Sequence, residues 1–276
     1  MKWTAQEIES KCREASKRLR LTLPQAQLLL AQERFLERLM LSKSGSNFIW
    51  KGGSLLIRRY NVLVIPRFTI DIDLLVRGSS VADTRKIFEE VAKINLNDSF
   101  NFKNIQESDM VRETPYGGKR FEINWSFLNK QNSQALQVDV CAGDVVDSIS
   151  IPDRDLFLIP SDTIAIQIYP AEFIFAEKLQ TLAQYKTGNT RLKDFIDLWM
   201  LVQRGFDNKV LVDAIQRCFH NRKQNLDPNE WQRVLKDKTL IELFEAARTR
   251  NFSELEIPTM NQLFLELRLF LDQLLF

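Results

Sequence analysis

Apolar residues at the start of the chain recur three and four positions apart, which is the spacing of an amphipathic helix. Pro24 stands at the start of one such pattern, where its fixed φ favours the first turn of a helix. Residues 42–47, with Gly45 among them, then interrupt the pattern with small and polar side chains. The sequence therefore predicts helical structure over most of the first fifty residues.

The middle of the chain changes to a two-residue period, which is typical of strands with one buried face. Ile70, Ile72 and Leu74 alternate with acids, and a later segment alternates aromatic with polar residues. Ser79 or Ser80 can cap a helix that separates these strands. Strands are expected over residues 62–65, 67–76, 100–105, 119–128 and 135–141, with a turn at Tyr116-Gly117-Gly118.

The second half of the chain returns to helical spacing. Pro170 and Glu172 form a typical helix opening, and Gly188 lies in the break after this first helix. Helices are expected over residues 170–185, 191–204, 209–222 and 229–248, and from residue 258 onward. We therefore expect an α+β protein, with a mixed-sheet lobe and helical cover over residues 1–160 and a helical lobe over residues 161–276.

Composition narrows the possible functions. Hydrophobic residues make up 45% of the chain and the net charge is +2, so the chain is globular and overall charge does not indicate nucleic-acid binding. The single histidine, His220, argues against a histidine-rich metal site. Isolated cysteines favour a reducing, cytoplasmic setting. The apolar run over residues 156–176 carries acids and prolines, so no membrane segment is expected.

Asp71 and Asp73 are the first candidate site residues. Residues two apart in a strand point to the same face, so their carboxylates project together. Two negative charges this close are costly unless a cation lies between them, and Mg²⁺ prefers hard oxygen ligands. Solvent-facing acids are the ordinary alternative, but the apolar residues on the other face indicate a strand with one committed polar face.

A glycine pair and a third acid extend this candidate site. Gly52-Gly53-Ser54 precedes an apolar run over residues 55–60 that is compatible with a short helix. Paired glycines let backbone N–H groups approach a phosphate at a helix N-terminus. Asp139 lies on an alternating strand like the first two acids, and three acids can hold the metals of phosphoryl transfer. A simple turn and an edge-strand acid remain the alternatives.

These motifs, in this order, carry a family resemblance. The segment RFTIDIDL at residues 67–74 follows the GGS motif, and VDV follows at residues 138–140. The closer match is YPAE with AEKL at residues 169–179, followed by RLKDFIDL at residues 191–198. The chain resembles the AbiEii/AbiGii-type toxin family of the nucleotidyltransferase superfamily, over residues 23–201.

The resemblance implies a two-lobed, nucleotidyltransferase-like fold, in which a helical lobe completes the active site of the sheet lobe. It implies Mg²⁺, a nucleoside triphosphate (NTP) and transfer to RNA, in some members to the 3′ end of tRNA, which blocks translation. It also implies a toxin–antitoxin, abortive-infection system with an antitoxin encoded beside the toxin. The family's functional positions match Ser54, Asp71, Asp73, Lys178 and Asp194.

The helical lobe offers its own phosphate-binding groups. Lys178, placed late in its predicted helix, is a compact charge suited to a triphosphate. Arg191 and Lys193 put cations at the start of the next helix, where they oppose the helix dipole unless an anion binds. Asp194 would complete this site, and solvated side chains are the ordinary alternative.

Local charge points to a phosphate-rich partner. Residues 178–223 hold nine Lys and Arg against four Asp, so this lobe is more basic than the whole chain. RNA is the expected partner, with Lys209, Arg217 and Arg222 as peripheral contacts. Nucleotidyl transfer to a protein or small-molecule hydroxyl stays open, as does a catalytically inactive module that binds a nucleotide or a partner protein.

Overall fold

The computed structural model describes residues 3–19, 21–59, 71–77, 81–110, 117–128, 130–131, 134–144, 146–161, 164–188, 191–251 and 257–275. The strand expected over residues 62–65, the start of the strand at 67–76, the Ser79 or Ser80 cap and Tyr116 lie outside the described residues. The chain divides into two compact units: Met1–Gly143 with Asp147–Tyr169, and Asp144–Val146 with Pro170–Phe276.

Among the described residues, the first unit contains four α-helices, and the sequence supplies a side-chain cap for the first two. They are α1 (Ala5–Arg18), α2 (Leu23–Leu41), α3 (Gly52–Arg59) and α4 (Thr84–Ala92). Thr4 and Thr22 each form a capping box with the residue three positions on, Glu7 and Gln25. Pro24 lies in the first turn of α2, so the helices and the helix start predicted for this segment are confirmed.

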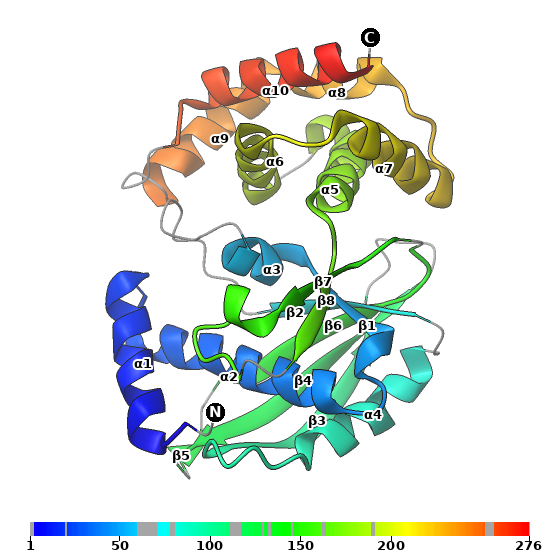
Figure 1. Cartoon of the computed structure of the whole chain (residues 1–276). Coiled ribbons are helices and arrows are strands. Elements are labelled where there is room, and N and C mark those ends of the chain that lie inside the picture. Colours follow the sequence, from blue (N-terminus) through cyan, green and yellow to red (C-terminus); the bar gives the residue numbers. More distant parts are fainter. Residues whose placement is uncertain are drawn as a thin grey trace. The chain divides into compact units, whose positions relative to one another are not determined.

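Within the described residues, eight strands form one mixed sheet (Figure 1). They are β1 (Phe48–Lys51), β2 (Asp71–Val76), β3 (Phe100–Asp109), β4 (Gly118–Phe127), β5 (Lys130–Gln131), β6 (Leu136–Cys141), β7 (Ile149–Pro152) and β8 (Ala165–Ile168). Their order is β3-β4-β6-β2-β1-β8-β7, with β5 paired to β4. The pairs β2–β6 and β1–β8 are parallel and the other pairs antiparallel.

The alternating pattern predicts β2, β4 and β6 but not β1, β5, β7 or β8. Each of the missed strands has four residues or fewer, too few for a two-residue period to stand out. Strand β3 is longer than predicted and runs to Asp109. Since β8 belongs to the sheet, the sheet extends past residue 160, where the sequence suggests a boundary.

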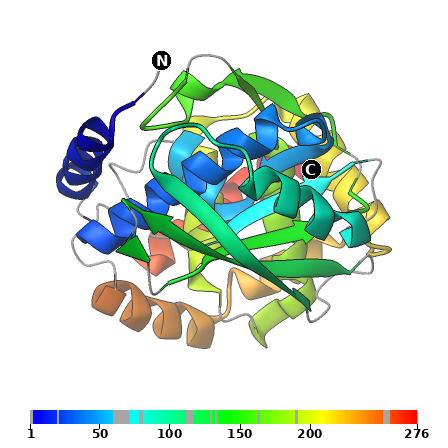
Figure 2. The ribbon, with the colours of Figure 1, turned by 90° about the horizontal axis from the view of Figure 1, so that it is seen from below.

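One face of the sheet carries the hydrophobic core of the first unit. Figure 2 shows α2 and α4 lying across this face. Phe88 of α4 packs edge-on against Phe35 of α2 and Phe121 of β4, with ring centroids 5.2 Å and 4.9 Å away. Because neighbouring side chains of a strand alternate between faces, Ile72 and Leu74 point into this core and the acids of β2 point to the other face.

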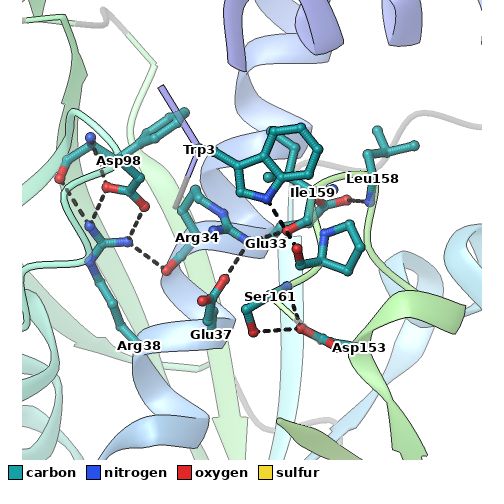
Figure 3. Close-up of polar contacts among 12 residues, drawn as sticks. Trp3, Glu33, Arg34, Glu37, Arg38, Asp98, Asp153, Leu158, Ile159 and Ser161 are labelled. Carbon is teal, nitrogen blue, oxygen red and sulfur yellow. Dashed lines mark hydrogen bonds and ion pairs between the residues drawn. The ribbon is translucent and has the colours of Figure 1, made fainter. Parts of the chain in front are cut away.

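Helix α2 also buries charged side chains (Figure 3). Arg38 donates two hydrogen bonds to the carboxylate of Asp98, at 2.9 Å and 2.7 Å. Glu33 accepts the backbone N–H groups of Leu158 and Ile159, at 2.9 Å and 3.2 Å. These buried, hydrogen-bonded charges attach two loops of the first unit to α2, and a helical hydrophobic pattern does not predict them.

The second unit is a bundle of helices. They are α5 (Ala171–Tyr185), α6 (Leu192–Arg204), α7 (Asn208–Asn221), α8 (Pro228–Val234), α9 (Lys238–Asn251) and α10 (Met260–Leu275). Phe195 stacks on Phe264 at 4.8 Å in its core. The prediction of one helix over residues 229–248 is wrong, because Asp237 accepts the N–H of Leu240 and so caps a separate helix, α9. Among the described residues, the helices are all too short or too polar to cross a membrane.

Candidate active site

Strand β2 places two acids on the polar face of the sheet. Asp71 and Asp73 are both half-buried, while Ile72 between them has no exposed surface. The parallel pairing of β2 with β6 sets Asp73 directly beside Asp139. Paired residues of neighbouring strands project from the same face, so the structure brings the three predicted acids onto one face.

An arginine that the sequence reasoning missed holds the third acid. Arg120 of β4 is paired with Asp139 and donates from Nε to Oδ1 at 2.8 Å and from Nη2 to Oδ2 at 2.7 Å. Hydrogen bonding to Asp139 raises the pKa of Arg120 above its ordinary value, and the charges of Asp71 and Asp73 raise it further. The sequence does contain a signal for this arginine. Arg120 precedes the core residue Phe121, and because side chains of a strand alternate between faces, Arg120 must lie on the polar face.

The acids fit a divalent metal ion only in part. Asp71 and Asp73 offer carboxylate oxygens on one face, which are the ligands that hard divalent cations prefer. Within the described part of the chain, no group of three or more His, Cys, Asp or Glu side chains is arranged to share a metal ion. Asp139 does not join Asp71 and Asp73 in such a group, because both of its carboxylate oxygens accept hydrogen bonds from the guanidinium of Arg120.

The glycine pair opens a helix directly beside the second acid. Helix α3 begins at Gly52, which has a φ of +74°. A Cβ atom at Gly52 would lie 1.9 Å from Oδ2 of Asp73 and 2.7 Å from its Cβ, so only glycine allows this approach. Ser54 is 2% exposed, and its hydroxyl accepts a hydrogen bond from Nε1 of Trp50 at 2.9 Å. We therefore assign the Ser54 hydroxyl to anchoring the start of α3.

In the second unit, α5 and α6 bring a lysine and two acids together. Nζ of Lys178 lies 2.6 Å from Oδ1 of Asp194 and 2.8 Å from Oδ2 of Asp197. The lysine and Asp194 side chains are 13% and 15% exposed, and that of Asp197 only 4%. Lys178 lies in the middle of α5, which spans Ala171–Tyr185, rather than late in the helix as expected.

The predicted cations around this lysine differ in their surroundings. Arg191 is exposed, with Nη1 4.0 Å from Asp194 and its guanidinium 5.6 Å from the ring of Tyr185. Lys193 is exposed on the first turn of α6. The side chain of Arg222, expected as a peripheral contact, is only 11% exposed and lies 3.5 Å from the carboxylate of Glu177.

Comparison with known proteins identifies the family. The model of the family described as "Nucleotidyl transferase AbiEii toxin, Type IV TA system" matches residues 34–267. No curated protein matches this chain.

Two solved structures from Helicobacter pylori are similar over most of their length. The crystal structure of JHP933 is 12% identical in sequence, and the match covers 89% of this chain and 91% of that one. Its TM-score of 0.52 shows a common fold. A crystal structure described as a candidate nucleotidyltransferase shares 13% identity and a TM-score of 0.41 over 89% of this chain and 93% of that one. By the extent of the family match, the chain belongs to the AbiEii family of nucleotidyl transferase toxins of type IV toxin–antitoxin systems, and it is a nucleotidyltransferase.

Proposed function

We propose that this protein transfers nucleotides from an NTP to RNA in the cytoplasm, with the 3′ end of tRNA as the acceptor and a block of translation as the result. The observation that carries the proposal is the polar face of the sheet, where Asp73 is paired with Asp139 and Asp71 lies two residues before Asp73 on the same strand. At Gly52, the start of α3 brings the backbone close to the carboxylate of Asp73. This combination supports phosphoryl-transfer chemistry rather than a passive binding module.

Asp71 and Asp73 are the residues that we expect to hold Mg²⁺, and Asp139 can join them when Arg120 releases it. A bound Mg²⁺ stabilises negative charge on the triphosphate and activates the attacking hydroxyl. The chain's own part is to present carboxylates from a rigid strand whose other side is fixed in the core by Ile72 and Leu74.

Lys178 is the residue that we expect to bind the triphosphate. Its ammonium is held in one orientation by Asp194 and Asp197, so little side-chain entropy is lost when phosphate binds. The two carboxylates also outweigh the single lysine charge, so a phosphate needs further cations. Arg191 and Lys193, both exposed at the start of α6, are the candidates for these additional cations.

Exposed cations of the second unit support RNA as the acceptor. Lys209 and Lys223 are exposed, and Arg217 is half-buried beside Phe173. Cations of this kind bind phosphate without reading sequence, so the affinity for RNA should fall with salt. The family also implies a cognate antitoxin that restrains the toxin in the cell.

The test is transfer of label to RNA from each of the four α-labelled NTPs in separate reactions with total RNA. Asp71→Asn should abolish labelling in the presence of Mg²⁺, whereas Asp109→Asn, an exposed acid at the end of β3, should leave it unchanged. Labelling of a protein or small molecule instead of RNA would contradict the acceptor. Equal labelling by Asp71→Asn and the wild type would contradict the whole assignment.

A further inference from the structure

Four charged residues form a row across the polar face of the sheet. Strand register places Lys51 of β1 opposite Asp73 of β2, Asp73 beside Asp139 of β6, and Asp139 opposite Arg120 of β4. Residues paired in this way project from one face with their Cβ atoms about 5 Å apart. Two acids therefore lie in the centre of the row and a cation lies at each end.

The two cations of this row have different surroundings. The side chain of Arg120 is 39% exposed, whereas the whole of Lys51 is 9% exposed and its ammonium lies 4.8 Å from the ring centroid of Tyr169. Arg120 binds Asp139 through two parallel hydrogen bonds, which is the strongest geometry for this pair of groups. Arg120 is thus the exposed cation, and it can leave its partner without breaking the core.

This arrangement changes the electrostatics of the acids. A cluster of carboxylates without a metal ion is costly unless another cation compensates it, and Arg120 supplies that positive charge from within the chain. A divalent ion that approaches Asp139 meets the guanidinium charge on the same two oxygens. The arginine and the metal ion therefore compete for one carboxylate.

We propose that Arg120 is a positioning residue that holds Asp139 away from a divalent metal ion until an NTP arrives, whose phosphates then give the arginine a new partner. The proposal rests on the metal site at Asp71 and Asp73 described above. It implies that the protein binds free metal weakly and binds the metal together with the nucleotide well. The arginine would thereby limit binding of the metal ion in the absence of nucleotide.

The test measures binding of Mn²⁺ alone to the whole chain, by electron paramagnetic resonance of the free ion, without NTP or RNA. Arg120→Gln should tighten Mn²⁺ binding by about tenfold, because it removes a positive charge close to the divalent ion. Arg120→Lys keeps the charge and should stay within about twofold of the wild type. Lys119→Gln is the matched control: it removes one charge from the neighbouring position of β4, where the side chain pairs with Glu107.

A double variant assigns the effect to Asp139. If Arg120 and the metal compete for this carboxylate, Asp139→Asn should remove the gain of Arg120→Gln when both are present. Binding of an NTP with Mn²⁺, measured by calorimetry, should instead weaken by about tenfold in Arg120→Gln, since a charge-assisted contact to phosphate is lost. Circular dichroism confirms that each variant is folded.

The result that overturns the proposal is unchanged or weaker Mn²⁺ binding in Arg120→Gln, or a gain that persists in the double variant. Arg120→Lys binding as tightly as Arg120→Gln would overturn it as well. The metal site itself is tested separately, because Asp71→Asn should abolish the Mn²⁺ binding of the wild type. Loss of binding in Asp71→Asn without a gain in Arg120→Gln therefore refutes only the role of the arginine.

Discussion

Replacing Gly52 with alanine tests whether close packing of the α3 start shapes the acid site. Two costs can be worked out from the structure. The first is backbone strain, since a residue with a Cβ at a φ of +74° loses about 1–2 kcal/mol. The second is overlap with Asp73, whose Oδ2 and Cβ would lie 1.9 Å and 2.7 Å from the new atom, against an ordinary contact of 3.4–4 Å.

The overlap cannot be relieved by rotating the carboxylate alone, because the Cβ of Asp73 is also too close. Strands β1 and β2 must separate locally, and overpacking of this kind costs about 1–3 kcal/mol. We therefore expect Gly52→Ala to lower the free energy of unfolding by about 2–5 kcal/mol in total. A folded domain has about 5–15 kcal/mol in all, so the variant should still fold.

Gly117→Ala is the matched control in the same unit. Gly117 has a φ of +67°, and no heavy atom among the described residues lies within 4 Å of an added Cβ. It should therefore show the backbone cost alone, about 1–2 kcal/mol. The assay is urea unfolding followed by tryptophan fluorescence, with Mn²⁺ binding as a second readout that should weaken only in Gly52→Ala. Equal losses of stability in the two variants, with Mn²⁺ binding intact in both, would refute the reasoning.

Three further predictions concern single side chains. Asp197→Asn leaves one carboxylate for Lys178 and should lower the free energy of unfolding by about 1–3 kcal/mol in urea. Burial raises the pKa of Glu37 in spite of the nearby Arg34. Because the unfolded chain then loses this proton first as the pH rises above the ordinary value of 4.5, the group lowers the free energy of unfolding over that range. Glu37→Gln should flatten that part of the pH–stability profile. Burial raises the pKa of the Cys12 thiol to about 12, so Cys12 should resist alkylation at mildly alkaline pH until the protein unfolds.

Each of these predictions has a clear contrary result. Unchanged stability of Asp197→Asn would mean that Asp194 alone compensates Lys178. For Glu37, the difference between the wild-type and variant stabilities should depend on pH, and a constant difference would contradict the raised pKa. Labelling of Cys12 in the native protein as fast as in urea would show that α1 and α2 do not protect it.

The strand and helix periods predict much of the fold. A two-residue period depends only on neighbouring residues, so β2, β4 and β6 can be recognised without knowledge of the rest of the chain. The same period assigns each side chain to a face, which is how Asp71 and Asp73 are identified as a pair. The break between α8 and α9 is missed because an aspartate cap inside a helical pattern is only a weak local signal.

What the sequence by itself determined is the α+β class, the polar face of the acids and the motifs that identify the family. Only the tertiary structure decided which groups meet: Asp139 with Arg120, Gly52 with Asp73, and Lys178 with Asp197. The reason is physical, since a period assigns a side chain to a face, whereas strand register and helix packing select its partner. Register depends on pairing between distant segments, and a slip of one residue would turn Arg120 into the core and leave Asp139 without its cation.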